Sequence, residues 1–206
     1  MIAHVIDDLF DHHFISSLEE ELLDNVGFFT TNIANKKSFP NGRRGGSHRL
    51  MGTDIFVREG LNHVTSLHEN AEPFFEMWNI IEEQVFNAPV YLRRIDVNLQ
   101  FYGQHGTPHT DGGSDEITVM VFNNSVWKPE WGGQFQILSD DLQTVLEEHE
   151  YIPGRIIIFP GDKPHRGLAP LDPYAYRYST VFRTIIEDDL EDYFDKEYQN
   201  RKQCKV

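Results

Sequence analysis

The chain has 206 residues and a formal net charge of −15, from 18 Lys and Arg against 33 Asp and Glu. At roughly 150 residues per domain we expect a single domain over residues 1–206, and the charge makes nucleic acid an unfavourable partner. The single cysteine, Cys204, excludes an internal disulfide and a cysteine-rich zinc site. No apolar run approaches the roughly 20 residues of a membrane span, and no leader signal is present. We therefore expect a soluble cytoplasmic protein without a membrane partner.

Two helices are predicted in the first half of the chain and one near its C-terminal end. Apolar residues recur at helical spacing over residues 9–24 and again over 71–87, where Pro73 suits a first turn. The sequence thus predicts an N-terminal part, over about 9–87, that carries these helices. The acidic stretch over about 187–200 is typical of a polar C-terminal helix.

After residue 90 the pattern changes to short runs of β-branched and aromatic residues, separated by Gly, Pro and Asn. The runs are Ile95–Tyr102, Glu116–Phe122, Gly133–Leu138, Arg155–Phe159 and Tyr176–Thr184. Short strands with turn signals and few helices between them are typical of an antiparallel sandwich or jelly roll. We expect this mainly β core over about residues 90–186, with the helices packed against it.

A long segment before that core, Asn25–Thr53, contains no Asp or Glu. Its basic residues are Lys36, Lys37, Arg43, Arg44 and Arg49. The glycine- and proline-rich centre is incompatible with regular structure, so a flexible loop is predicted. Loops of this length are often lids over a site, and a passive surface loop is the alternative.

Arg43 and Arg44 provide a test of the lid hypothesis. A basic lid would suit an acidic or carboxylate-bearing substrate. Replacing both residues with Ala is therefore expected to raise the apparent KM for such a substrate and to leave the binding of a second ligand outside the lid unchanged. Steady-state kinetics measure both, and an unchanged KM would exclude the lid.

A candidate metal site is formed by three side chains. His109 and Asp111 are two residues apart, so on a strand both side chains point to one face. His165 follows the predicted strand Arg155–Phe159 and can complete a set of two imidazoles and one carboxylate, which is typical of non-haem Fe(II) sites with open positions. A His-x-Asp pair alone is a weak signal, because it is common by chance. Of the other histidines, only His48 and His105 are candidates for reaching the site.

The last predicted strand carries an unusual cation. Arg177, Ser179 and Arg183 share one face of it. A buried Arg needs an anionic partner, and its planar fork fits a carboxylate through two hydrogen bonds. A small dicarboxylate whose far end meets Arg177 and Ser179 explains both residues. For either arginine, an internal salt bridge to one of the 33 acids is the alternative.

Taken in order, these motifs resemble the Fe(II)- and 2-oxoglutarate-dependent dioxygenases, and most closely the prolyl 4-hydroxylase-like branch. The resemblance rests on the following stretches: Val5–Phe10, His109–Asp111, Ile117–Asn124, Trp131–Phe135, Pro153–Pro160, His165–Gly167 and the Arg-x-Ser pattern at Arg177. It covers most of the chain. Each stretch alone is unspecific, whereas the ordered set is specific.

The resemblance implies a double-stranded β-helix, which is a cupin-like jelly roll. It implies that His109, Asp111 and His165 bind Fe(II), and that Arg177 and Ser179 bind the distal carboxylate of 2-oxoglutarate. Tyr102, placed on a polar strand face with Asn98 and Gln100, is expected to contact the same co-substrate. O2 is the second co-substrate, and ascorbate is a candidate stimulant.

The function expected from the resemblance is hydroxylation of an unactivated C–H bond, with succinate and CO2 as co-products. A peptidyl, prolyl-like residue is the first candidate substrate, and a free amino acid is the second. Two alternatives remain open. One is demethylation of a nucleic acid on the same fold, which the pair Arg177 and Arg183 would permit. The other is a non-catalytic jelly-roll binding module.

Overall fold

The computed structural model describes residues 1–31, 50–59, 63–86 and 90–186. The predicted C-terminal helix and the lid residues Arg43 and Arg44 lie outside these ranges. No helix of the described part is long and apolar enough to cross a membrane. The cytoplasmic location stays a prediction.

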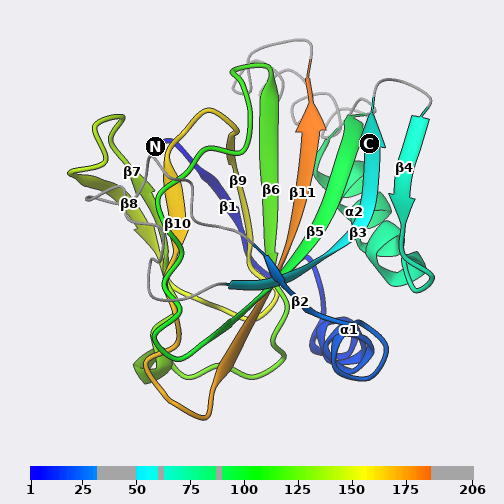
Figure 1. Ribbon diagram of the computed structural model, residues 1–206, viewed down its shortest axis with the longest axis horizontal. Helices are drawn as coiled ribbons and strands as arrows, with labels where there is room; N and C mark the ends of the chain where they lie inside the picture. Colours follow the sequence, from blue (N-terminus) through cyan, green and yellow to red (C-terminus); the bar gives the residue numbers. More distant parts are fainter. Residues whose placement is uncertain (32–49, 60–62, 87–89, 187–206) are drawn as a thin grey trace, which may run out of the picture.

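The described chain forms two antiparallel sheets and two α-helices (Figure 1). In chain order the elements are β1 (His4–Ile6), α1 (His12–Asp24), β2 (Phe29–Thr31), β3 (Leu50–Glu59), β4 (His63–Leu67), α2 (Glu72–Val85), β5 (Tyr91–Phe101), β6 (Glu116–Phe122), a short 3-10 helix (Pro129–Trp131), β7 (Phe135–Leu138), β8 (Val145–His149), β9 (Ile156–Pro160), β10 (His165–Gly167) and β11 (Tyr176–Ile185). This mainly β architecture confirms the predicted jelly-roll core with packed helices.

The larger sheet has the strand order β1-β9-β6-β11-β5-β3-β2, with β4 paired to β3. The smaller sheet has the order β10-β7-β8 and faces the larger one (Figure 1). Strands that neighbour each other in the larger sheet are often far apart in the chain, as β1 and β9 are. The site described below lies between the two sheets.

Both helices pack on the face of the larger sheet that points away from the smaller one. The side chain of Asp11 caps α1 by accepting a hydrogen bond from the backbone N–H of Phe14 at 2.8 Å. In α2 the buried residues Phe74, Met77, Trp78, Ile81 and Val85 follow helical spacing. They join one hydrophobic cluster with the inner residues of β5, β6, β9 and β11.

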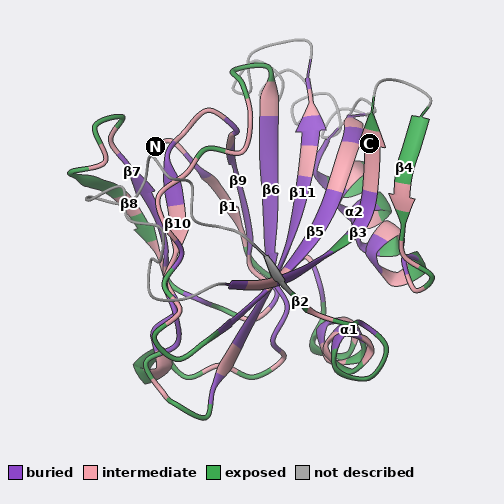
Figure 2. Ribbon diagram, viewed as in Figure 1, coloured by how far each residue is buried: buried purple, intermediate pink, exposed green. Residues whose placement is uncertain are grey.

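Strand β6 is buried on both faces (Figure 2). Val119 and Val121 belong to the cluster under the helices, whereas Met120 and Phe122 belong to a second cluster between the two sheets. This alternation is the period-two pattern of a strand between two layers. The same alternation on β11 points Tyr178 and Phe182 toward the helices.

The sequence predicts no strand between the two helices, but the structure has three strands there. That region contains β2, β3 and β4, and β3 is a strand of the larger sheet. Both ends of the stretch 25–53, which was predicted as a loop, are also strands: Phe29–Thr31 pairs with Leu50–Gly52. Gly52 and Asp54 within β3 weaken its local β-propensity, so its extended form depends on pairing with β5.

Candidate metal centre

His109 and His165 lie opposite each other in an isolated antiparallel bridge. The backbone N–H of each donates to the carbonyl oxygen of the other, at 3.1 Å from His109 and 2.9 Å from His165. The two imidazole rings therefore project to the same side, with centroids 4.4 Å apart. A tertiary contact thus joins two residues that sequence spacing alone could not pair.

Hydrogen bonds to the backbone fix the tautomer of both histidines. Nδ1 of His109 lies 2.8 Å from the carbonyl oxygen of Thr107, and Nδ1 of His165 lies 2.9 Å from that of Lys163. A carbonyl oxygen only accepts, so each Nδ1 carries the hydrogen and each Nε2 presents its lone pair to the cavity. Burial, followed by the neighbouring His165, lowers the pKa of His109 and favours the neutral ring that binds a metal.

The carboxylate of Asp111 lies close to both Nε2 atoms. Its carboxylate oxygens are 3.7 Å from Nε2 of His109 and 3.4 Å from Nε2 of His165. Burial alone would raise the pKa of Asp111, but His165, Arg183 and His109 outweigh it and hold that pKa well below the ordinary value. Asp111 is therefore a carboxylate at neutral pH despite its burial.

The three donors form a compact set, with one ligand atom from each residue within 4.8 Å of the others. Two neutral imidazole nitrogens and one carboxylate oxygen on one side leave further coordination positions free for a co-substrate. This donor set and its open side fit Fe(II). The structure brings together the three residues predicted from the sequence.

A buried cation lies in the same cavity. Arg177 is 1% exposed and donates from Nε to the carbonyl oxygen of Gly133 at 2.9 Å. Its Nη1 donates to Oε1 of Gln100 at 2.8 Å and to Oγ of Ser179 at 3.2 Å. Its Nη2 is buried without a hydrogen-bond partner. Burial lowers the pKa of Arg177 to about 10, which leaves it charged at neutral pH.

The environment of Arg177 is otherwise apolar. The guanidinium stacks over the rings of Phe122 and Tyr151, at 5.1 and 5.2 Å from their centroids. Among the described residues it forms no ion pair, so the alternative of an internal salt bridge finds no support there. A carboxylate ligand would supply both a counter-charge for the buried guanidinium and a hydrogen-bond acceptor for its Nη2.

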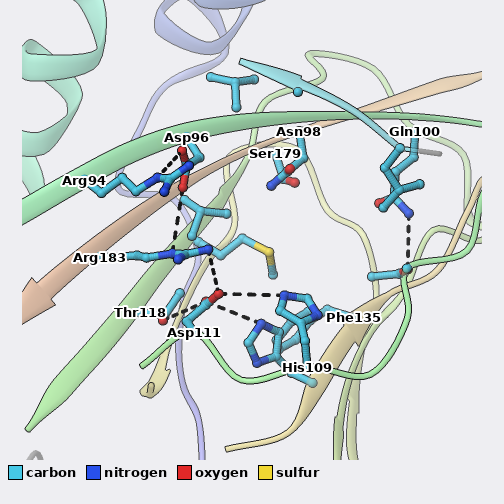
Figure 3. Close-up of a pocket in the computed structure, with 18 of the residues that line it drawn as sticks. Arg94, Asp96, Asn98, Gln100, His109, Asp111, Thr118, Phe135, Ser179 and Arg183 are labelled. Carbon is cyan, nitrogen blue, oxygen red and sulfur yellow. Dashed lines mark hydrogen bonds and ion pairs between the residues drawn. The ribbon is translucent and has the colours of Figure 1, made fainter. Parts of the chain in front are cut away.

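A cavity of about 410 Å³ joins these features. Its walls come from β3, β5, β6, β9 and β11 of the larger sheet, from β7 and β10 of the smaller one, and from the loop between β5 and β6. In Figure 3, Gln100 lies on one side and Arg94 with Asp96 on the other, with Asn98 and Ser179 between them. His109 and Asp111 lie below this polar wall (Figure 3). The cavity has room for a small dicarboxylate and part of a second molecule.

A second charged cluster in this cavity was not identified from the sequence. Nε of Arg94 donates to Oδ1 of Asp96 at 2.6 Å, and Nη2 of Arg94 donates to Oδ1 of Asp54 at 2.7 Å. Burial raises the pKa of Asp96 to about 6, although Arg94 and Arg183 oppose that shift. The only available signal was the alternation of polar residues along β5, which extends from Arg94 through Asn98 to Gln100.

The remaining predicted site residues have different positions. Ser179 lines the cavity beside Arg177, whereas Arg183 forms an ion pair with Asp111. Tyr102 follows the end of β5, is 58% exposed and is not among the cavity's lining residues, so its predicted role with the co-substrate gains no support. Nδ1 of His105 accepts a hydrogen bond from the backbone of Ala169. His48 lies outside the described residues.

Comparison with known proteins agrees with this geometry. Residues 97–182 match the family model of the 2OG-Fe(II) oxygenase superfamily. This match confirms the resemblance predicted from the motifs, and it lies within the jelly-roll core of the chain. Fe(II) and 2-oxoglutarate are the cofactor and co-substrate of that superfamily. The three metal donors fit Fe(II), and the buried Arg177 in the same cavity fits a carboxylate of 2-oxoglutarate. No curated protein sequence matches the chain significantly.

Solved structures share the fold at low sequence identity. An oxidoreductase of the 2OG-Fe(II) oxygenase family from Burkholderia pseudomallei is 13% identical with a TM-score of 0.65, over 91% of this chain and 86% of that one. A Pseudomonas putida prolyl-4-hydroxylase is 14% identical with a TM-score of 0.56, over 90% and 93%. The viral collagen prolyl hydroxylase of Paramecium Bursaria Chlorella virus-1, solved with 2OG, is 14% identical with a TM-score of 0.53, over 90% and 97%.

Proposed function

We propose that the protein is an Fe(II)- and 2-oxoglutarate-dependent oxygenase that hydroxylates an unactivated C–H bond. His109, Asp111 and His165 would hold Fe(II), and Arg177 with Ser179 would bind the distal carboxylate of 2-oxoglutarate. The observation that carries this proposal is the uncommitted, buried Nη2 of Arg177 in the same cavity as the three donors. A metal site alone would not require such a cation, and a structural arginine would be paired with an acid.

The residues of the chain supply geometry and a controlled environment. Both imidazoles are held as Nε2 donors by backbone carbonyls, and Asp111 is held ionised by its neighbours. Gln100 and Ser179 orient the Arg177 guanidinium toward the cavity. When bound, Fe(II) and 2-oxoglutarate would supply, together with O2 as the oxidant, the chemistry that yields succinate, CO2 and a hydroxylated product. Phe135 and Phe159 line the cavity and limit the access of water.

The favoured substrate is a peptidyl, prolyl-like residue, with a free amino acid as the second candidate. Two solved neighbours of the fold are prolyl hydroxylases, which supports the first. The half-exposed side chains of Arg94 and Asp54 at the cavity wall offer both charges to a polar substrate, which suits either candidate. Arg183, which had left nucleic-acid demethylation open, is paired with Asp111 and no longer favours that alternative.

The proposal is tested by measuring succinate formed from 2-oxoglutarate with Fe(II) and O2. Candidate peptides and amino acids are added in turn, and a gain of 16 mass units on the candidate identifies the product. We expect slow uncoupled succinate formation without substrate and faster turnover with the correct one. Ascorbate is included and omitted in parallel, because we expect it to stimulate turnover. Absence of succinate under all conditions, together with absence of metal binding, would support the non-catalytic module.

A further inference from the structure

Arg183 lies on the cavity face of β11, as Arg177 does. Unlike Arg177, it forms ion pairs with carboxylates. Its Nη2 lies 3.0 Å from Oδ1 of Asp111, and its Nε lies 3.8 Å from Oδ2 of Asp96. The second contact is an ion pair too long for a hydrogen bond, and Nε has no hydrogen-bond partner. Arg183 therefore links the carboxylate of the candidate metal centre to a second buried carboxylate.

Charged residues on the neighbouring strands extend this link. Arg183 is directly opposite Arg94 across β11 and β5, and Asp96 is directly opposite Asp54 across β5 and β3. Like charges directly opposite each other destabilise a sheet. Here the diagonal ion pairs between the strands offset that repulsion. Arg94 joins Asp54 and Asp96, and Asp96 faces Arg183. The last carboxylate reached by this chain of ion pairs is Asp111 (Figure 3).

Asp111 is held through both of its oxygens. The hydroxyl of Thr118 donates to Oδ2 at 2.9 Å, while Nη2 of Arg183 lies at 3.0 Å from Oδ1. The loop before it is fixed by the backbone N–H of Asp111, which donates to the carbonyl oxygen of Gly161 at 2.9 Å. A carboxylate bound on both oxygens cannot rotate freely, so its remaining lone pairs have fixed directions.

We propose that Arg183 is a positioning residue of the metal centre, which is held by Asp96 and fixes Asp111 for binding a divalent metal through one oxygen. This inference rests on the proposed function only in taking Asp111 as a metal ligand. Outer hydrogen-bond partners of metal ligands orient those ligands, and their loss typically weakens metal binding by about 10- to 100-fold. The guanidinium also offsets the negative charge of Asp111 when no metal is bound.

The test measures metal binding without substrate or turnover. Co(II) is titrated into the apo protein, and the affinity is taken from calorimetry while the visible absorption bands report the coordination geometry. Arg183→Gln, which removes the charge, is expected to weaken Co(II) binding by about 10- to 100-fold and to change the bands. Arg183→Lys, which restores a cationic donor but not the fork, should recover part of the affinity.

Two further variants separate positioning from folding. Asp96→Asn does not touch Asp111 and should weaken Co(II) binding in the same direction by a smaller factor. Arg155→Gln removes an arginine that pairs with Asp7 away from the cavity and should leave Co(II) affinity and spectrum as in the wild type. The melting temperature of each apo variant shows that the fold is retained.

The outcomes distinguish this inference from the proposed function. If the wild type fails to bind Co(II), the metal centre itself is excluded, and the proposed function fails with it. If the wild type binds Co(II) and Arg183→Gln binds it equally well with the same spectrum, only the role of Arg183 is excluded. Tighter binding by Arg183→Gln would also overturn the inference, because the guanidinium would then repel the metal more than it orders Asp111.

Discussion

Replacing Asp111 with Asn is expected to abolish Fe(II)-dependent turnover and to weaken metal binding by more than about 100-fold. A factor of about 100 is the upper end of the loss in metal affinity when an outer hydrogen-bond partner is removed. Asp111 is expected to contribute more to metal affinity because it would bind the metal directly. An amide keeps the shape of the side chain but carries no charge, and it removes the carboxylate that pairs with Nη2 of Arg183. Co(II) titration and succinate formation measure the two effects separately.

Asp140→Asn serves as the matched control for this experiment. Asp140 is an exposed residue between β7 and β8, so its replacement should change neither metal affinity nor turnover. Circular dichroism of Asp111→Asn should match that of the wild type, which separates loss of metal from loss of fold. Wild-type Co(II) affinity in Asp111→Asn would mean that the carboxylate is not a ligand.

Elements with a strong local period could be predicted from the sequence. The buried stripe of α2 follows helical spacing, and β6 was predicted with the bounds that the structure gives it. On β11 the alternation was sufficient to place Arg177, Ser179 and Arg183 on one face and to separate them from Tyr178 and Phe182. In each case the signal is contained within a few neighbouring residues.

Elements that depend on partners could not be predicted in this way. Strand β3 includes Gly52 and Asp54, and it is kept extended by β5 on one side and by β2 and β4 on the other. Strand β8 has no buried residue and therefore no apolar face, and β10 has only three residues, so neither gives a strand pattern in the sequence. Both strands are defined by their pairing with β7, and such pairing cannot be read from a few neighbouring residues.

In the candidate site, too, residues paired by local spacing could be predicted, whereas contacts between distant parts of the chain could not. His109 with Asp111, and Arg177 with Ser179, are pairs at strand spacing, so their side chains were predictable as pairs. The contact between Arg183 and Asp111 joins β11 to the loop between β5 and β6 and was not predictable. Gln100 was placed on a polar strand face, but its bond to Arg177 follows from the register of β5 against β11. Tyr102 failed to reach the cavity because β5 ends one residue before it.

Replacing Arg177 with Met is expected to raise the KM for 2-oxoglutarate at least about 30-fold, with little change in Co(II) affinity. Losing one partner of a buried, hydrogen-bonded charge pair costs about 2–5 kcal/mol, and the lower bound corresponds to this factor. Arg177→Lys keeps the charge but not the fork and should show an intermediate KM. In the Co(II)-loaded protein, 2-oxoglutarate should raise the melting temperature of the wild type and not that of Arg177→Met.

Gly167 provides an independent test of the same anchor. A Cβ at this position would approach Oε1 of Gln100 to 3.0 Å and the terminal nitrogens of Arg177 to 3.2 and 3.3 Å. Gly167→Ala is therefore expected to displace the guanidinium and to raise the KM for 2-oxoglutarate less than Arg177→Met does. Gly27→Ala is the matched control, since its Cβ would make only an ordinary contact with the ring of Phe29. Wild-type KM values in both Arg177→Met and Gly167→Ala would place the co-substrate's distal carboxylate elsewhere, because both changes act on the same guanidinium.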